Sequence, residues 1–474
     1  MIARATRAFT IAAALTLPMQ AQAQSVEDLQ RQIDELKAQI KALVDARAAS
    51  EPSSASAASP AAPPSPPAPP SALAHAAVSP PAAPAESEES GKKWYDRLKL
   101  RGYTQMRYNG FLGGDRTAPA GRARLRSVHD SAIDGDGGFA LRRARLVLEG
   151  DVTDNISIYL QHDFASAVNN QSNGERREHF GQLRDAYVDL FPTRDRSFRL
   201  RFGQSKVPFG WENLQSSSNR LTLDRSDAIN SAAPGERDLG IVAYYTPPRV
   251  QAIWDALEEK GQKLFGNYGA FGLGVFNGAG TNRSEHNGGL MTVAMATWPF
   301  ALDGLGGAFE GQVLEIGGSA MRNRYRPEIR EGGVSGGDFK DDRIGLHAIL
   351  YPQPLGIQAE WNWGRGPEFD LGRQAIRAQK LSGGYVQLMV DVGETAVGKL
   401  TPYARWQHYR GGWKAATNAP RLETDEIELG IEWQFMEAME LTVAYARMKR
   451  AEADERRTGR ATGDLIRTQL QWNY

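Results

Sequence analysis

The chain of 474 residues contains no cysteine, which excludes disulfide bridges and thiol chemistry without indicating a compartment. It also lacks any uninterrupted apolar run of roughly 18 residues, the length that a membrane-spanning helix needs. If the protein lies in a membrane, it therefore crosses it as a β-barrel. Basic and acidic residues balance to a formal net charge of zero, so the composition predicts no general affinity for nucleic acid or other polyanions.

The N-terminus has the composition of a secretory signal peptide. Arg4 and Arg7 precede the apolar run FTIAAALTLP, and the small residues Ala21 and Ala23 follow it. This order of charged, apolar and small residues predicts cleavage near Ala23, so that residues 1–23 are removed from the mature protein.

A short heptad pattern and a proline-rich segment come next. Apolar residues spaced alternately three and four apart predict a coiled-coil helix over residues 24–48; they are Val26, Leu29, Ile33, Leu36, Ile40 and Leu43. Fewer than three heptads do not fix the number of helices, and a single amphipathic helix docked on another surface is the alternative. Residues 49–93 are rich in Pro, Ala and Ser and cannot bury a core, so they predict a disordered, partly extended linker.

From Trp94 to the C-terminus, apolar and polar residues alternate in segments of about ten residues, the length of a membrane-spanning strand. In the first segment, LKLRGYTQMRY, Leu98 and Met106 fall on one face while Arg101 and Arg107 fall on the other. Fifteen further segments begin near residues 140, 155, 183, 197, 238, 269, 289, 308, 341, 356, 377, 399, 425, 440 and 463. The total of sixteen is even, as in bacterial outer-membrane barrels.

The connections alternate between long loops and tight turns, which predicts that the loops gather at one end and the turns at the other. The exception is 247–268, where we predict a turn that carries a small helix. Because lipid forbids unpaired backbone groups and open sheet edges, we predict an all-β fold over residues 94–474, a 16-stranded antiparallel transmembrane β-barrel. A large secreted all-β protein is the alternative. A barrel of this size encloses a water-filled lumen.

Several segments carry a pattern of a known family. They are FALRRARLVLEG, NISIYLQHDFA, LRDAYVDLFP and, most specifically, LRFGQSKVPFGWENLQSSS with APGERDLG. Together they resemble the phosphate-selective porin O/P family of Gram-negative outer membranes, over about residues 95–474. The resemblance implies a passive, trimeric, anion-selective channel whose long third loop folds into the lumen. It also implies a ladder of basic side chains that guides phosphate-type anions, with the N-terminal stalk and the C-terminus in the periplasm.

The segment FRLRFGQSKVPFG links this resemblance to the strand pattern. Leu200 and Phe202 are expected to face lipid, while Arg199 and Arg201 face the lumen. Proline removes a backbone donor and glycine permits unusual dihedral angles, so the Val-Pro-Phe-Gly that follows is expected to end the strand where loop three turns inward.

Alternation assigns a set of basic side chains on the strands to the lumen: Arg101, Arg107, Arg143, Arg145, Arg199, Arg201, Arg405 and Arg467. Because the last strand closes against the first, five of them are expected to form one contiguous basic wall: Arg467, Arg101, Arg107, Arg143 and Arg145. By match to the family's motif regions, Arg143, Arg145 and Lys206 are placed at or near the constriction, and Arg220, Arg225 and Arg237 in loop three. A guanidinium group suits phosphate because its fork of donors matches two oxygens at once.

Carboxylates are expected to oppose this set. The alternation also turns Glu149, Asp163, Asp185, Asp189, Glu360, Glu428 and Glu432 inward. If they neutralise the basic side chains, a general diffusion porin with little anion preference is the alternative function. A structural protein that tethers the membrane to the cell wall through the coiled coil is a second alternative. No metal-ligand spacing, nucleophile elbow or nucleotide-binding motif occurs, so neither an enzyme nor a cofactor is predicted.

Overall fold

The structure is a computed structural model, and it describes residues 93–115, 138–166, 179–266, 268–456 and 458–474. These residues belong to one compact unit, Ser87–Tyr474. The predicted signal peptide, the coiled coil and the linker up to residue 92 lie outside the described residues and stay predictions. In the described part of the chain, no helix is long and apolar enough to cross a membrane.

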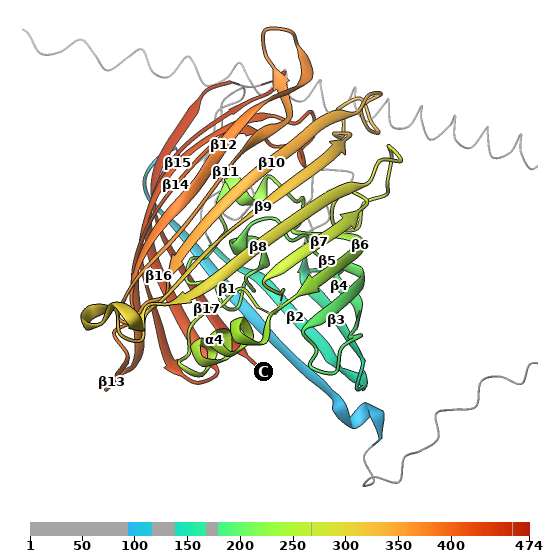
Figure 1. The fold of residues 1–474 in the computed structure, drawn as a ribbon. Helices are drawn as coiled ribbons and strands as arrows, with labels where there is room; N and C mark the ends of the chain where they lie inside the picture. Colours follow the sequence, from blue (N-terminus) through green and yellow to red (C-terminus); the bar gives the residue numbers. More distant parts are fainter. Residues whose placement is uncertain (1–92, 116–137, 167–178, 267, 457) are drawn as a thin grey trace, which may run out of the picture. The chain divides into compact units, whose positions relative to one another are not determined.

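One antiparallel sheet closes on itself into a barrel (Figure 1). Its strands are β1 Leu98–Gly114, β2 Gly138–Thr153, β3 Ile156–Ser166, β4 Phe180–Leu190, β5 Phe198–Lys206, β6 Arg237–Tyr245, β7 Phe271–Phe276, β8 Met291–Ala301, β9 Val313–Tyr325, β10 Phe339–Leu350, β11 Leu355–Asp370, β12 Ala375–Val390, β13 Glu394–Thr395, β14 Gly398–Gly412, β15 Arg421–Met436, β16 Met439–Ala453 and β17 Arg460–Asn473. Since β13 is only a two-residue ladder beside β14, the described residues form sixteen full strands, and the predicted fold class is confirmed.

Closure depends on the pairing of β1 with both β2 and β17. The last residue of the chain completes it, because the Gly102 N–H donates to the Tyr474 carbonyl at 2.6 Å and the Tyr474 N–H donates to the Gly102 carbonyl at 2.9 Å. A Cβ atom on Gly102 would lie 2.3 Å from the Arg145 carbonyl oxygen, so this approach needs glycine. The ring therefore has no open edge, which is the condition for a sheet in lipid.

The two ends of the barrel differ as the sequence predicts. Long connections, among them 207–236, 277–290 and 326–338, lie at one end, which we call the loop end. At the other, the turn end, β2–β3 and β15–β16 are joined by two residues each. One connection at the turn end is long: residues 246–270 join β6 to β7 and carry helix α4 (Pro248–Glu259), as expected for 247–268.

The prediction for the start of one strand was wrong by five residues. β9 begins at Val313 and not near 308, because Gly307 and Gly311, on either side of residues 308–310, have positive φ angles and leave the extended conformation. Two short 3-10 helices, η3 (Asp303–Leu305) and η4 (Gly307–Phe309), occupy this turn instead. A third, η1 (Trp94–Arg97), precedes β1.

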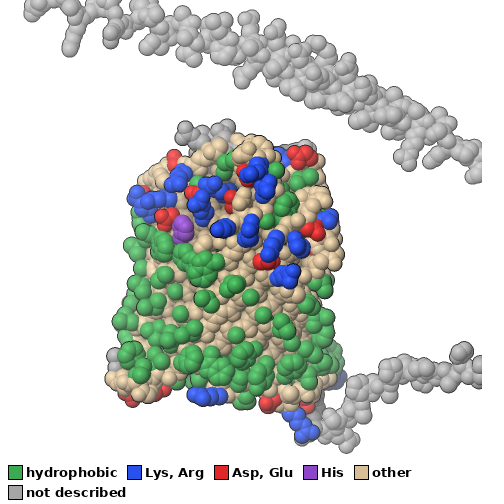
Figure 2. Space-filling model, turned by 45° about the horizontal axis from the view of Figure 1, so that its top comes forward, with side chains coloured by type: hydrophobic (Ala, Val, Ile, Leu, Met, Phe, Trp, Pro, Cys, Tyr) green, Lys and Arg blue, Asp and Glu red, His purple; other side chains and the backbone are tan. Residues whose placement is uncertain are grey.

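A belt of apolar side chains covers the outside of the barrel (Figure 2). Those at least 49% exposed include Leu273, Ile316, Ile344, Leu346, Leu388, Ile427 and Leu429. Soluble proteins rarely expose contiguous apolar patches of more than a few hundred Å², so this belt indicates contact with lipid. On β5 the predicted faces are confirmed, since Phe202 is 38% exposed while Arg199 and Arg201 are buried inside.

Part of the interior is filled by a hydrophobic core. Phe209 and Trp211, from the segment after β5, pack with Trp254 of α4 against the inner faces of β6–β10. The buried charged side chains lie mainly on the remaining strands, as for Arg107 on β1, Arg145 on β2 and Arg467 on β17. A solute path through polar surroundings is therefore restricted to the side of the lumen formed by β11–β17 and β1–β5.

Leu429 lies between Ile427 and Ile431 on the lipid-facing side of β15. The substitution Leu429→Arg is expected to lower the free energy of unfolding by about 2–4 kcal/mol, because it places a charge in the apolar part of the bilayer. Urea titration of the protein in phospholipid vesicles measures this change. The control Leu429→Ile is expected to shift it by less than about 1.5 kcal/mol. An Arg variant as stable as the parent would mean that this face does not contact lipid.

Candidate functional site

Residues 207–236 connect β5 to β6 through the interior of the barrel, and we call them the inward loop (Figure 1). They include two short helices, α2 (Trp211–Leu214) and α3 (Asp227–Asn230). Gly210 sits at the first bend with a φ of 88°, a conformation that favours glycine. A Cβ atom there would also lie 2.8 Å from Glu360 Oε1, so the loop can approach β11 closely only with glycine at this position.

One side of the inward loop is held by charged groups on β11 and β14. The carboxylate of Glu360 accepts hydrogen bonds from the backbone N–H groups of Trp211 at 2.8 Å and Glu212 at 3.0 Å. The side chain of Glu212 pairs with Arg405 at 2.7 Å and 3.2 Å. Hydrogen bonds to ionised groups are stronger than neutral ones, so these contacts fix the start of the loop.

The other side of the loop contacts β17, β1 and β2. Ser217 Oγ shares a hydrogen bond of 2.5 Å with the Tyr103 hydroxyl and accepts one from Arg145 at 3.1 Å. Asp224 pairs with Arg107 at 2.9 Å and with Arg467 at 2.5 Å. The loop is thus attached to opposite walls and crosses the lumen.

The five residues of the predicted basic wall lie on neighbouring strands. Arg467 is on β17, Arg101 and Arg107 on β1, and Arg143 and Arg145 on β2. Their backbones are neighbours across the sheet, since Arg145 opposes Tyr103 and Arg467 opposes Asn109. Four of the five are paired with carboxylates, so the wall carries alternating charge.

Ten of the twelve predicted basic residues have a carboxylate partner. The pairs are Arg101–Glu149, Arg107–Asp224, Arg145–Asp163, Arg199 and Arg201 with Asp189, Lys206 and Arg225 with Glu236, Arg237 with Asp185 and Glu236, Arg405–Glu212, and Arg467 with Asp224 and Glu428. Arg237, expected in loop three, is instead the first residue of β6, because its backbone pairs with Lys206 of β5. Of the two remaining predicted inward acids, Glu360 holds the inward loop and Glu432 pairs with Lys263.

Arg143 and Arg220 are the other two predicted basic residues, and among the described residues neither has a carboxylate within ion-pair distance. Arg143 is 3% exposed and donates to Gln105 Oε1 at 2.6 Å. Arg220, on the inward loop, is 5% exposed, and its Nε and Nη2 atoms have no acceptor. Arg142, Arg145 and Arg220 are all close enough to repel Arg143 electrostatically.

Burial, together with repulsion from Arg225, lowers the pKa of Arg220 to about 10. Its side chain therefore keeps its charge at neutral pH. Buried donors normally find an acceptor, and two neighbouring guanidinium groups repel each other unless an anion lies between them.

A cavity of about 660 Å³ lies between the inward loop and the turn end, and we call it the turn-side vestibule. Six predicted residues line it: Arg101, Arg145, Arg199, Arg201, Lys206 and Arg237. Its described lining includes nine basic and four acidic side chains, so positive charge predominates here although the whole chain is neutral. The arrangement attracts anions from the adjoining solution.

Tyrosine rings position two of the vestibule's guanidinium groups. The Arg201 guanidinium lies 3.7 Å from the centroid of the Tyr187 ring, which stacks on Tyr159 at 5.0 Å. Arg199 lies 4.8 Å from the centroid of Tyr244. Contacts of a cation with an aromatic face are attractive and limit side-chain motion.

Sequence reasoning missed several residues of this site. Glu212, Asp224 and Glu236 of the inward loop pair with predicted arginines, and no alternation applies in a loop, so the pattern gave no signal for them. Tyr159 and Tyr187 lie on strands, and extending the alternation to uncharged residues would have turned them inward. Among the described residues there is no group of three or more His, Asp or Glu that could hold a metal ion.

A family model described as phosphate-selective porin O and P matches residues 123–474. A comparison with curated proteins finds no match. Among solved structures, the chain is similar to the outer membrane channel DcaP of Acinetobacter baumannii, with 14% sequence identity, 80% of this chain and 97% of that chain covered, and a TM-score of 0.46.

Two further solved structures are similar to this chain. The Salmonella typhi OmpF complex with daunomycin has 13% identity, coverage of 80% of this chain and 97% of that chain, and a TM-score of 0.48. The anion-selective porin from Comamonas acidovorans has 13% identity, coverage of 80% and 99%, and a TM-score of 0.45.

The attachment of the inward loop by Glu360 can be tested by the substitution Glu360→Ala. The two backbone N–H groups of Trp211 and Glu212 lose their acceptor, and each hydrogen bond contributes about 0.5–1.5 kcal/mol. We expect amide hydrogen exchange in residues 211–214 to become at least about tenfold faster, measured by mass spectrometry of loop peptides. The control Glu432→Ala removes an inward carboxylate that pairs with Lys263, and it should leave these amides unchanged. Equal exchange in both variants would contradict the attachment.

Proposed function

Since this chain belongs to the family of phosphate-selective porins O and P, we propose that it is a passive outer-membrane channel that prefers phosphate-type anions. The outer-membrane channel follows from the family itself. The charges in the lumen support a preference for phosphate, pyrophosphate or polyphosphate.

The observation that carries the proposal is the pair of cations Arg143 and Arg220. Every other predicted cation in the lumen has a carboxylate partner, while among the described residues these two have none within ion-pair distance, and Arg220 adds to the electrostatic repulsion at Arg143. A phosphate dianion offers oxygens to both guanidinium forks at once. Chloride has no such geometry, so it is expected to bind less well at this position.

Release of the ion is supported by the surroundings. The paired arginines of the turn-side vestibule, such as Arg199 and Arg201, share their charge with Asp189 and therefore offer weaker sites than an isolated guanidinium. A channel conducts when binding is strong enough for entry and weak enough for exit, which several moderate sites in series provide. We infer a path from the loop end past Arg143 and Arg220 into the vestibule.

The orientation of the barrel in the membrane and its oligomeric state are inferred from the family. Outer-membrane barrels place short turns in the periplasm and long loops outside, so we infer that the turn end, the residues before β1 and Tyr474 lie on the periplasmic side. A homotrimer is the assembly that the family resemblance implies. The predicted coiled coil and linker would then extend into the periplasm, where contact with the cell wall is the proposed role of the stalk.

A general diffusion porin is the competing function, and the observation that favours it is that ten of the twelve predicted basic residues are paired with carboxylates. If Arg143 and Arg220 do not bind the permeating ion, opposed charges leave little net preference. The tethering alternative is separate, since it depends on residues 24–92, and deletion of these residues would then weaken the envelope while leaving channel currents intact.

The double substitution Arg143→Gln with Arg220→Gln tests the anion site. In planar bilayers under a KCl gradient, the parent is expected to give an anion-selective zero-current potential, and added phosphate is expected to block the chloride current. Since charge-assisted hydrogen bonds contribute about 1.5–3 kcal/mol each, the variant should need at least about tenfold more phosphate for the same block. Arg143→Lys keeps the charge but loses the fork, so it should retain selectivity with a weaker block.

The matched control is Arg447→Gln, which removes a cation from the outer face of β16, where Arg447 pairs with Asp464. It should leave both the potential and the phosphate block as in the parent. If the parent protein gave a zero-current potential near zero and phosphate did not block its chloride current, the proposed selectivity for phosphate would be contradicted, although the protein would still be a channel.

A further inference from the structure

The outer surface of the barrel has a concave region, lined by residues of β7–β12, β14 and β15, with a volume of about 1290 Å³. It lies on the outside of the wall, so it belongs to neither the lumen nor the vestibule. In Figure 2, basic side chains gather above the apolar belt, toward the loop end. A charged region that directly borders an apolar belt is at the level where lipid headgroups meet acyl chains.

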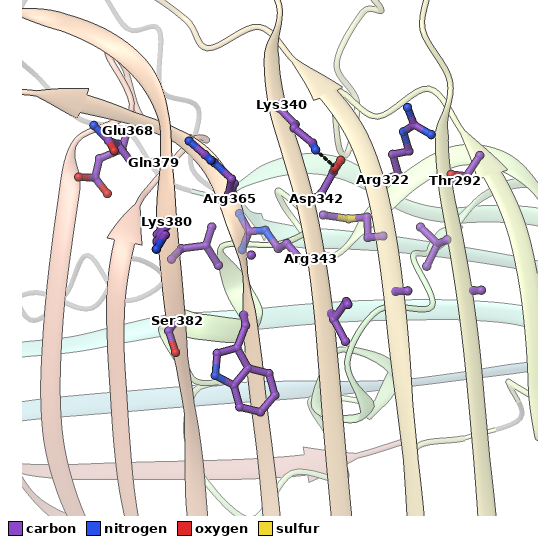
Figure 3. Close-up of a pocket in the computed structure, with 18 of the residues that line it drawn as sticks. Thr292, Arg322, Lys340, Asp342, Arg343, Arg365, Glu368, Gln379, Lys380 and Ser382 are labelled. Atoms are coloured by element: carbon purple, nitrogen blue, oxygen red, sulfur yellow. Dashed lines mark ion pairs between the residues drawn. The ribbon is translucent and has the colours of Figure 1, made fainter.

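The upper part of this region is a row of charged side chains on four neighbouring strands (Figure 3). The register places Arg322 of β9 opposite Asp342 of β10, Asp342 opposite Arg365 of β11, and Arg365 opposite Lys380 of β12. Directly paired residues on one face of a sheet have neighbouring side chains. With strands about 4.8 Å apart, the row spans roughly 15 Å. We call it the outer basic row.

The outer basic row has surplus positive charge. Its one acid, Asp342, already pairs with Lys340 at 2.8 Å. In the described part of the chain, Arg322 and Lys380 have no ion-pair or hydrogen-bond partner, and Arg365 donates only to the Ala378 carbonyl at 3.2 Å. These three exposed cations are available to an external anionic group.

On the turn-end side of the outer basic row, the outer surface is apolar and contains both small and large side chains. Ala320, Ile344 and Trp363 lie on the same strands and the same outer face as the row, each two positions nearer to the turn end. Ala294 of β8 is paired with Ala320. Ile344 is 60% and Trp363 46% exposed. The alanines leave a depression between larger apolar side chains, which suits an extended hydrocarbon chain.

We propose that this surface binds a phosphorylated lipid of the outer leaflet. The headgroup phosphate contacts Arg322, Arg365 and Lys380, and an acyl chain lies on the apolar surface formed by Ala320, Ile344 and Trp363. The proposal uses the orientation given above, with the loop end outside, and is independent of anion selection in the lumen. A second protein copy on this surface would bury unpaired cations, which costs several kcal/mol per ion, whereas a lipid phosphate neutralises them.

The test compares the parent with the triple variant Arg322→Gln, Arg365→Gln and Lys380→Gln, both as full chains in detergent. Binding of lipid A is measured by native mass spectrometry, with lipid A lacking its phosphates as the second probe and inorganic phosphate as the third. Each basic residue near a membrane surface contributes about fivefold to the binding of anionic lipid. We therefore expect roughly 100-fold weaker binding of phosphorylated lipid A by the variant, and no difference for the dephosphorylated lipid.

The matched control removes three other outward cations near the loop end, through Arg447→Gln, Lys449→Gln and Arg460→Gln on β16 and β17. This control variant should bind lipid A within about threefold of the parent. If both triple variants lost binding equally, the loss would reflect net charge alone and would overturn the proposed site. Two other results would also overturn it: unchanged affinity in the first variant, or a change in its oligomeric state. Displacement of the lipid by equimolar inorganic phosphate would assign the row to free phosphate instead. None of these readouts depends on channel currents, so they are separate from the test of selectivity.

Discussion

Every other feature of this molecule depends on the requirement that backbone N–H and C=O groups be paired inside lipid. A sheet meets it only as a closed ring, and here the last residue of the chain closes the ring by exchanging two hydrogen bonds with Gly102. Closure fixes which side chains face inward, because alternation along each strand has no freedom once both neighbours are paired. It also gives the inward loop two opposite walls to bind, so the lumen is divided by the same constraint that makes the barrel stable.

The charges inside the lumen are better understood as a network with an excess at one position than as a uniformly basic surface. Strand carboxylates such as Asp163 and Asp189 compensate the arginines beside them, and loop carboxylates compensate those across the lumen. Desolvated charges without partners are costly, so most of this pairing is needed for folding. Arg143 and Arg220 have no carboxylate partner among the described residues, and burying a charge without a partner lowers stability. Features that cost stability cluster at functional sites, which supports a functional role for these two arginines.

The sequence predicted the features that depend on the alternation of residues along a strand. It did not predict the features that depend on contacts between residues far apart in the chain. The sixteen strands and the inward faces of Arg107, Arg145 and Arg467 follow from alternation, and the helix in the segment 247–268 from its length and composition. The pairing of Arg405 with Glu212 joins residues 193 positions apart through a loop, and no local pattern encodes it. The start of β9 was missed because Gly307 and Gly311 have positive φ angles, which an alternation of residue types does not reveal.

The same alternation that fills the lumen with charge also determines the outer surface. In the apolar belt, an outward cation would be driven into hydrocarbon, so Arg322, Arg365 and Lys380 can occupy outward positions only above it, near the loop end. Nothing in barrel closure requires them there, since polar uncharged residues would meet the same conditions, as Thr292 does on β8. Arg322, Arg365 and Lys380 lie on three of four adjacent strands, and Arg322 and Lys380 have no ion-pair partner among the described residues. Their mutual repulsion does not stabilise the fold. Their position at the edge of the belt is best explained by an anionic group supplied by the membrane itself.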